Sequence, residues 1–159
     1  MNDILLKAND NVFGLRTAGI CLNKERVLLC KTNHNGGYAL PGCYVNFSKT
    51  SEEALEEYLN KELNADVIVD DLKWIGESLY LREKYPCHEI CFYYTFTIIS
   101  SNPIKTVGSV QNGITYKWLP LSSINSVKTF PENLKELIDN LHSDKLVHFV
   151  DRQIKKQVL

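Results

Sequence analysis

The chain has 159 residues, which is enough for a single domain with a buried core and too short for two ordinary domains. Hydrophobic residues make up 44% and charged residues 23% of it, which excludes a disordered, collagen-like or coiled-coil protein. With 18 Lys and Arg against 19 Asp and Glu, the formal net charge is -1, so no overall positive field attracts a nucleic-acid backbone. We expect one domain spanning residues 1–159 and no non-specific nucleic-acid binding.

Targeting segments and cysteines bear on the location of the protein. The first ten residues lack the pattern of a signal peptide, and the longest apolar-aromatic run, 91–99, is too short for a membrane span. Five cysteines without a Cys-x-x-Cys pair favour a reduced, cytoplasmic protein. Cys87, His88 and Cys91 form only a partial zinc set, because a tetrahedral site needs a fourth ligand, and we favour their interpretation as strand residues.

In the first half of the chain, the residues follow the alternating pattern that is typical of β-strands. Residues 12–22 predict a strand that ends at the turn Asn23-Lys24, and the apolar run within 26–31 predicts a second strand, paired with the first as a hairpin. Residues 34–37 are a loop signal rich in glycine. A short extended segment, 38–40, then stops at Pro41-Gly42.

After residue 50 the apolar residues are spaced as in an α-helix. Thr50 and Glu53 form a capping box, in which the hydroxyl and the carboxylate each accept a backbone N–H. Asn64 tolerates the left-handed conformation of a helix end, so we expect a helix from about residue 51 to 64. Its apolar stripe consists of Ala54, Leu55, Tyr58, Leu59 and Leu63.

The second half of the chain predicts more strands and one further helix. Extended segments are expected at 65–69, 72–81, 88–99 and 113–119, and Pro131 is expected in the first turn of a helix that continues through Ile138. The tail 145–159 is amphipathic, and the sequence leaves its structure open. Strands and two helices in this order favour a mixed α/β sandwich over a doubly wound sheet.

A tight glycine turn followed by the capped, acidic helix marks the region where we expect the chemistry. The helix has glutamates at 52, 53, 56, 57 and 62. A divalent cation bound on a helix needs carboxylates at i, i+3 and i+4, because those spacings share one face.

This region resembles the Nudix hydrolase superfamily (MutT-like), whose box reads G-x5-E-x7-R-E-U-x-E-E-x-G-U, with U a bulky aliphatic residue. Tyr38-Ala39-Leu40-Pro41-Gly42 is similar to the aromatic-x-Leu-Pro-Gly-Gly segment that opens the box. Residues 13–20, 26–31, 88–94 and 117–121 are similar to strands of many members. The resemblance covers most of the chain and implies an α/β fold, a Nudix-type α/β/α sandwich with a mixed β-sheet.

The box is degenerate when it is counted from Cys43 in place of the opening glycine. Three acidic positions of the family hold Tyr58, Lys61 and Glu62, so only Glu62 keeps a metal-binding glutamate. Moving the register back by one residue puts Glu57 on a glutamate position and still leaves the paired acids unmatched. The candidate metal ligands are therefore Glu62 and Glu57.

The resemblance implies that the acidic cluster binds Mg²⁺ or Mn²⁺, which activates water and neutralises the diphosphate that is cleaved. A lysine in place of a carboxylate opposes this, since like charges at about 4 Å repel by several kcal/mol at an intermediate dielectric. We therefore expect weakened or lost catalysis, with Lys61 binding a diphosphate or another anion directly. Lys49 and Glu57 invert the charges at two further box positions, and we expect them to form an ion pair.

Other residues are candidates for ligand contacts or proton transfer. Arg16 is a candidate phosphate contact, or else a charge at the rim of the sheet. Tyr38 either stacks on a base or packs in its short strand. Glu89 is a candidate general base or substitute metal ligand, or else a strand residue that faces solvent. For Tyr58 we favour a place in the core over a catalytic role. The candidate catalytic residues are thus Glu62 and Glu89, and the candidate ligand-binding residues are Arg16, Tyr38 and Lys61.

Three functions remain open at this point. The first is a Nudix hydrolase-like protein that binds a nucleotide or related phosphorylated ligand between the central sheet and the 50–63 helix, with catalysis weakened or lost. The second is an active metal-dependent pyrophosphohydrolase in which Glu57 or Glu89 joins Glu62 as a substitute ligand. The third is a non-catalytic protein-interaction module. Because the family often forms dimers, a homodimer is a further expectation.

Overall fold

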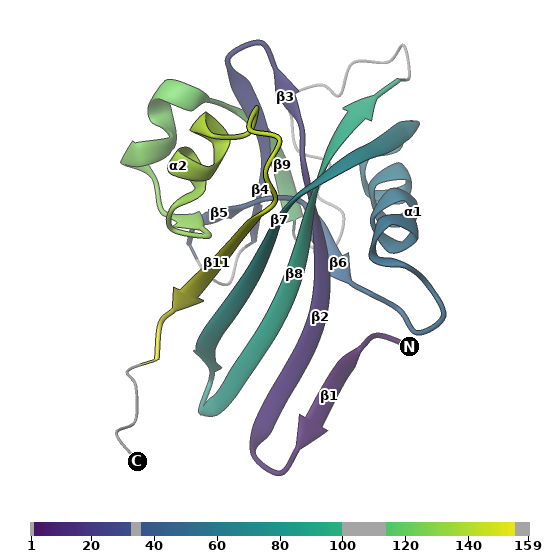
Figure 1. Cartoon of the computed structure of the whole chain (residues 1–159), viewed down its shortest axis with the longest axis vertical. Helices are drawn as coiled ribbons and strands as arrows, with labels where there is room; N and C mark the ends of the chain where they lie inside the picture. Colours follow the sequence, from purple (N-terminus) through teal and green to yellow (C-terminus); the bar gives the residue numbers. More distant parts are fainter. Residues whose placement is uncertain (1, 33–35, 100–113, 155–159) are drawn as a thin grey trace.

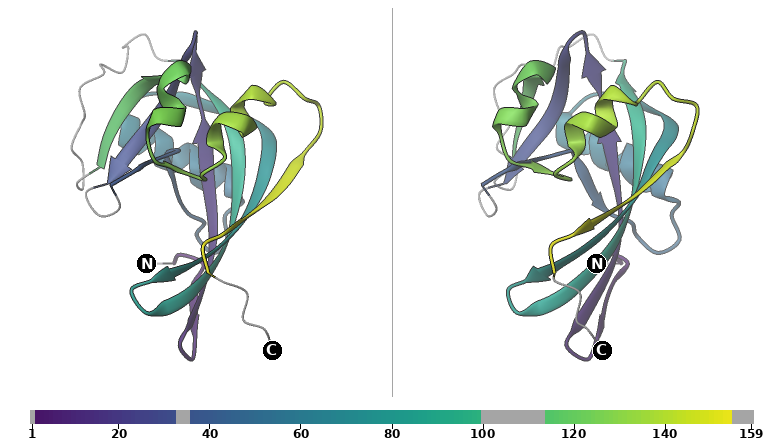
Figure 2. Two further views of the ribbon diagram at one scale, coloured as in Figure 1. Left: turned by 90° about the vertical axis from the view of Figure 1, so that its left-hand side faces the viewer. Right: turned by 60° about the vertical axis from the view of Figure 1, so that its left-hand side comes forward.

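The computed structural model of the chain describes residues 2–32, 36–99 and 114–154, and its elements lie in three layers (Figure 1). Helix α1 covers one side of two central β-sheets, and η1 and α2 cover the other (Figures 1 and 2). The predicted α/β sandwich with a mixed sheet is therefore confirmed. The elements are, in chain order, β1 (Leu5–Ala8), β2 (Asn11–Ile20), β3 (Leu22–Asn23), β4 (Arg26–Thr32), β5 (Tyr38–Ala39), β6 (Gly42–Tyr44), α1 (Ser51–Leu63), β7 (Val67–Arg82), β8 (Tyr85–Ile98), β9 (Ile114–Pro120), η1 (Leu121–Ser126), β10 (Thr129–Phe130), α2 (Leu134–Asp139) and β11 (Val147–Arg152).

The two sheets divide the strands between them. The larger has the order β1-β2-β8-β7-β11, with β6 paired to β2, and the smaller has the order β10-β5-β4-β3, with β9 paired to β4. In the larger sheet β2 runs parallel to β8 and β11 parallel to β7, whereas β7 and β8 form a long antiparallel hairpin. Such mixed pairing is typical of sheets in α+β and α/β folds.

The predicted hairpin between residues 12–22 and 26–31 is wrong except at its tip. Only β3 pairs with β4, through Leu22 with Val27 and Asn23 with Arg26. Strand β2 lies in the larger sheet beside β8, and β4 pairs along its length with β9. The chain passes from one sheet to the other near Cys21, so the two apolar runs face different neighbours.

The predicted helix is confirmed together with both of its ends. The Thr50 hydroxyl accepts from the Glu53 backbone at 3.1 Å, and the Glu53 carboxylate accepts from the Thr50 backbone at 2.8 Å. The latter bond holds the pKa of Glu53 below its usual value. Asn64 ends the helix in the left-handed region with φ 47°. Leu55 and Leu59 are fully buried, which fixes the face that α1 turns to the sheets.

Several other elements differ from the sequence predictions. The two segments 65–69 and 72–81 form one strand, β7, which is irregular around Asp70 and Asp71. The second helix begins at Leu134 and not at Pro131, because residues 129–130 pair with β5 and the chain turns before α2. Strands β1 and β6 were not expected. The described part of the tail contains β11, whereas residues 34 and 35 of the predicted loop, residue 113 and the tail residues 155–159 lie outside the described residues.

The core consists of two clusters, one on each side of the larger sheet. One cluster lies toward η1 and α2 and includes Trp74, Ile20 and Leu134. The other lies beneath α1 and includes Leu55, Leu59 and Phe96. In the described ranges no helix combines the length and the apolar character needed to cross a membrane.

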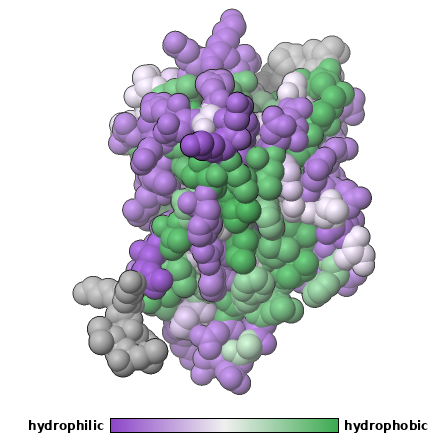
Figure 3. Space-filling model, in the orientation of Figure 1, coloured by the Kyte–Doolittle hydropathy of each residue, from purple (hydrophilic) through white to green (hydrophobic). Residues whose placement is uncertain are grey.

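The larger sheet is longer than the layers that cover it. The lower halves of β2, β7 and β8, flanked by β1 and β11, extend beyond α1 and α2 (Figures 1 and 2). The same region is seen in Figure 3 as a mainly apolar surface crossed by polar side chains.

Candidate functional site

Glu62 lies on the buried side of α1 and is only 6% exposed. The Tyr116 hydroxyl, from β9, donates a hydrogen bond of 3.2 Å to its carboxylate. The hydroxyls of Tyr116 and Tyr58 are 2.8 Å apart. Tyr58 and Glu62 share one face of the helix because they are four residues apart. We call these three side chains the Glu62 cluster.

The hydroxyls of the Glu62 cluster are held in their protonated form. Burial raises the pKa of Tyr58 and of Tyr116, and the nearby Glu62 carboxylate raises both further. Protonated phenols act here as hydrogen-bond donors and as packing groups. Tyr58 packs against the core beneath α1, so its predicted place in the core is confirmed.

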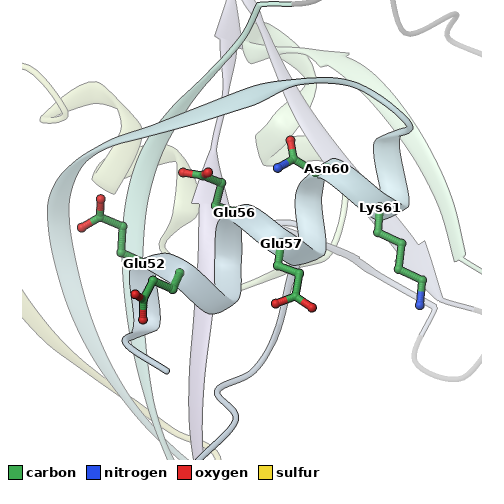
Figure 4. A pocket seen from close by; sticks show the side chains of 6 residues that line it. Glu52, Glu56, Glu57, Asn60 and Lys61 are labelled. Atoms are coloured by element: carbon green, nitrogen blue, oxygen red, sulfur yellow. The ribbon is translucent and has the colours of Figure 1, made fainter. Parts of the chain in front are cut away.

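The opposite, exposed side of α1 carries the predicted ion pair. Lys49 and Glu57 form a salt bridge, with 36% and 67% of their side chains exposed. Glu57 and Lys61 point to one side of the helix, whereas Glu56 and Asn60 point to the other (Figure 4). Lys61 is exposed, and no other described residue forms an ion pair with it. A shallow hollow on this outer surface is lined by Glu52, Glu53, Glu56, Glu57, Asn60 and Lys61.

The ligand pocket predicted between the central sheet and the helix stays a prediction. Core side chains, among them the fully buried Leu28, Leu55 and Leu59, fill the space beneath α1. An amphipathic helix gains its stability by burying such a stripe.

A second polar group, here called the Glu89 cluster, lies on the larger sheet. Glu89 is 6% exposed and accepts a hydrogen bond of 2.6 Å from Tyr44 on β6. An Arg16 Nη atom lies 3.9 Å from the carboxylate, and the guanidinium lies over the Tyr44 ring. Arg82 donates to the Tyr44 hydroxyl at 2.9 Å. Burial, followed by the hydrogen bond to Glu89, raises the pKa of Tyr44, so this phenol stays protonated.

Tyr38 on β5, another predicted ligand contact, is half-buried. It packs against the core toward η1 and α2, and the Lys31 ammonium lies 5.5 Å from its ring centre. The Glu89 cluster brings together Arg16 and Glu89, whereas Glu62 belongs to the other cluster. The roles of all six candidate residues stay predictions.

The described residues do not fit a resident divalent cation. Within them, no group of three or more His, Cys, Asp or Glu side chains is arranged to hold a metal ion. Glu62 faces inward to Tyr116, and Glu57 faces outward to Lys49. Among the zinc candidates, Cys87 is buried, whereas the neighbouring His88 bonds to Glu77. Successive strand residues point to opposite faces, which separates Cys87 from His88.

Sequence reasoning missed Tyr116 and Tyr44, the two donors that hold the buried carboxylates. Tyr116 is 54 residues from Glu62, and Tyr44 is 45 residues from Glu89. No local spacing signals such pairs. The one signal in the sequence is that Glu62 lies beside the apolar stripe of the helix, because a buried carboxylate needs a hydrogen-bond donor from elsewhere in the fold.

We predict that the Lys49–Glu57 pair depends on opposite charge and not on its order. Lys49→Glu or Glu57→Lys alone should lower the free energy of unfolding by about 0.5 kcal/mol, because each places like charges together. The double reversal should recover most of this loss in urea unfolding at low salt. Glu56→Lys, outside any described ion pair, is the charge control. Equal losses in all three pair variants would contradict the prediction.

Tyr116→Phe should destabilise the protein more than Tyr58→Phe. It removes the donor to the Glu62 carboxylate, and leaving a buried charge without its donor costs about 1–3 kcal/mol. Tyr58→Phe keeps that donor and is the matched control, with an expected loss of about 1 kcal/mol. Urea unfolding at pH 7 measures both. A larger loss in Tyr58→Phe would show that Tyr116 is not the group that stabilises Glu62.

Solved structures of other proteins share this arrangement of elements. The mutator MutT protein from Bacillus halodurans is 17% identical with a TM-score of 0.59, over 86% of this chain and 90% of that one. An ADP-ribose pyrophosphatase from Streptococcus suis is 13% identical with a TM-score of 0.52, over 87% and 98%. A NUDIX hydrolase from Nitrosomonas europaea is 13% identical with a TM-score of 0.61, over 81% and 88%.

The similarity lies in the structure and not in the sequence. No family model matches the chain, and no curated protein matches it. The structural matches nevertheless cover most of the chain and most of each neighbour. The chain therefore has the fold of the Nudix hydrolases.

Proposed function

We propose that this chain is a Nudix-fold protein that binds a nucleoside diphosphate-linked or related phosphorylated small molecule, with metal-dependent hydrolysis weakened or lost. The observation that carries the proposal is the Glu62 cluster. Its only carboxylate is hydrogen-bonded inside the protein, beside two phenols. The ligand class is supported by the fold and by one neighbour whose name states that it acts on ADP-ribose.

The loss of metal chemistry follows from charge and direction. A hard divalent cation takes its ligands from several oxygen atoms that point to one place. The three helix positions concerned supply a protonated phenol at Tyr58, an ammonium at Lys61 and the inward-facing Glu62. An ammonium repels the cation, so these three positions do not favour binding of Mg²⁺ or Mn²⁺.

The same charges favour direct binding of an anion. The Lys61 ammonium is exposed and has no ion-pair partner among the described residues, so it is available to phosphate oxygens. Arg16 is half-exposed, and the buried Glu89 carboxylate and the Tyr44 ring orient its guanidinium. We assign Lys61 and Arg16 to the phosphate groups, Tyr38 to a base, and Glu89 to the positioning of Arg16.

We expect ADP-ribose to raise the melting temperature equally with Mg²⁺ and with EDTA. Lys61→Glu should weaken binding at least about tenfold, since an ion pair with a phosphate is replaced by repulsion. Lys24→Glu, in the exposed turn between β3 and β4, is the matched charge control. Calorimetric titration with ADP-ribose and with ADP measures both. Binding only with Mg²⁺ would favour the active hydrolase, and no binding would favour the protein-interaction module.

Restoring two carboxylates should restore the metal site. We expect Tyr58→Glu combined with Lys61→Glu to gain Mn²⁺ binding and metal-dependent cleavage of ADP-ribose, because both acidic positions are then refilled. Tyr58→Phe combined with Lys61→Gln removes the same groups without adding carboxylates, and serves as the control. Wild-type turnover that depends on Mg²⁺, or no gain of either property in the double variant, would contradict the proposal.

A further inference from the structure

The Glu89 cluster contains two guanidinium groups and one carboxylate. Arg16 and Arg82 come from β2 and β7, the two strands that flank β8, which carries Glu89 (Figure 1). Tyr44 touches both arginines: the guanidinium carbon of Arg16 lies 5.3 Å from its ring centre, and its hydroxyl accepts from Arg82 at 2.9 Å. Within the described residues Arg82 forms no ion pair. Two arginines therefore gather around a single carboxylate.

The cluster has an excess of one positive charge. Two phenols near the carboxylate, Tyr44 and Tyr80, add no charge, because burial raises the pKa of each and the Glu89 carboxylate raises it further. Residues 83–84 of the adjacent turn contribute one charge of each sign. Asp151, on the edge strand β11, forms no ion pair with either arginine. A local excess of positive charge favours an anionic ligand.

The Arg16 guanidinium has donors that the described residues leave without an acceptor. Its Nε atom is buried and has no hydrogen-bond partner among them. Its Nη1 atom lies 3.9 Å from the Glu89 carboxylate, which is close enough for an ion pair and too far for a hydrogen bond. Buried donors in folded proteins are normally paired, so this N–H group points to an acceptor from outside the chain. Because 38% of the side chain is exposed, such an acceptor can reach the guanidinium from solvent.

The backbone of the sheet holds Tyr44 at the centre of the cluster. Tyr44 on β6 lies directly beside Arg16 on β2. A Cβ atom at Gly14 would lie 2.8 Å from a ring carbon of Tyr44 and 3.2 Å from Cγ of Glu89, so the missing side chain lets the ring reach the carboxylate. The Tyr44 hydroxyl donates its proton to Glu89 at 2.6 Å and accepts from Arg82. The phenol thus orients Arg82 and has no proton left for a ligand, which leaves the two guanidiniums as the donors.

We propose that Arg16 and Arg82 together bind a terminal phosphate group, a phosphate monoester, at the Glu89 cluster. The inference deepens the proposed function, because it rests on the assignment of Arg16 to a phosphate group. The two guanidiniums come from different strands and contact different parts of Tyr44. A tetrahedral phosphate monoester offers three free oxygens to two such groups, whereas a planar carboxylate is already saturated by one arginine fork. The expected ligand therefore ends in a phosphate.

The test is calorimetric titration of the full-length chain with inorganic phosphate, at low salt and in a buffer free of other phosphates. Wild-type protein should bind phosphate, and should bind acetate at least about tenfold more weakly. Arg82→Gln should weaken phosphate binding at least about tenfold, because one charged fork is lost. Arg152→Gln is the matched control, since Arg152 is an exposed arginine that lies beside Leu79, on the opposite face of the same sheet. It should bind phosphate as the wild type does.

Lys61→Glu separates this inference from the proposed function, because it should weaken binding of ADP-ribose and leave binding of inorganic phosphate unchanged. A chain that ignores ADP-ribose but binds phosphate through Arg82 contradicts the proposed function and supports this inference.

Four results overturn the inference: a wild-type chain that does not bind phosphate, unchanged binding in Arg82→Gln, an equal loss in Arg152→Gln, and acetate bound as tightly as phosphate. If Arg82→Gln fails to fold by circular dichroism, Arg82→Lys carries the test. Lysine keeps the charge and lacks the fork, so phosphate binding should still weaken, and unchanged binding would overturn the inference.

Discussion

The site depends on one buried hydrogen bond, from the Tyr116 hydroxyl to the Glu62 carboxylate. Burying an ionised carboxylate is costly unless a donor is present, and Tyr116 supplies that donor from another element. Because Tyr58 lies one helical turn before Glu62, it enters the same cluster and bonds to Tyr116. The carboxylate thus stabilises the contact between α1 and the smaller sheet. The exposed side of the helix is left to the Lys49–Glu57 pair and to Lys61.

The solved Nudix structures share the fold at 13–17% identity, which illustrates how little of a sequence a fold requires. In this chain the apolar periodicity and the caps of α1 fix which face of that helix packs against the sheets. Activity depends on a few side chains placed within that frame, and these vary independently of it. Tyr58 and Lys61 are examples: lysine suits a helix as well as glutamate does and tyrosine only slightly less, yet both change what the helix surface can bind.

Local patterns in the sequence determined the helix 51–63, its capping box, its left-handed end at Asn64 and the Lys49–Glu57 pair, because each depends on residues less than about ten positions apart. Tertiary structure alone decided that β2 lies beside β8 and not β4, that β11 runs parallel to β7, and that Glu62 and Glu89 bond to Tyr116 and Tyr44. These contacts join residues about 45 to 75 positions apart, and many partners satisfy the same local pattern. Only the packing of the whole chain selects among them.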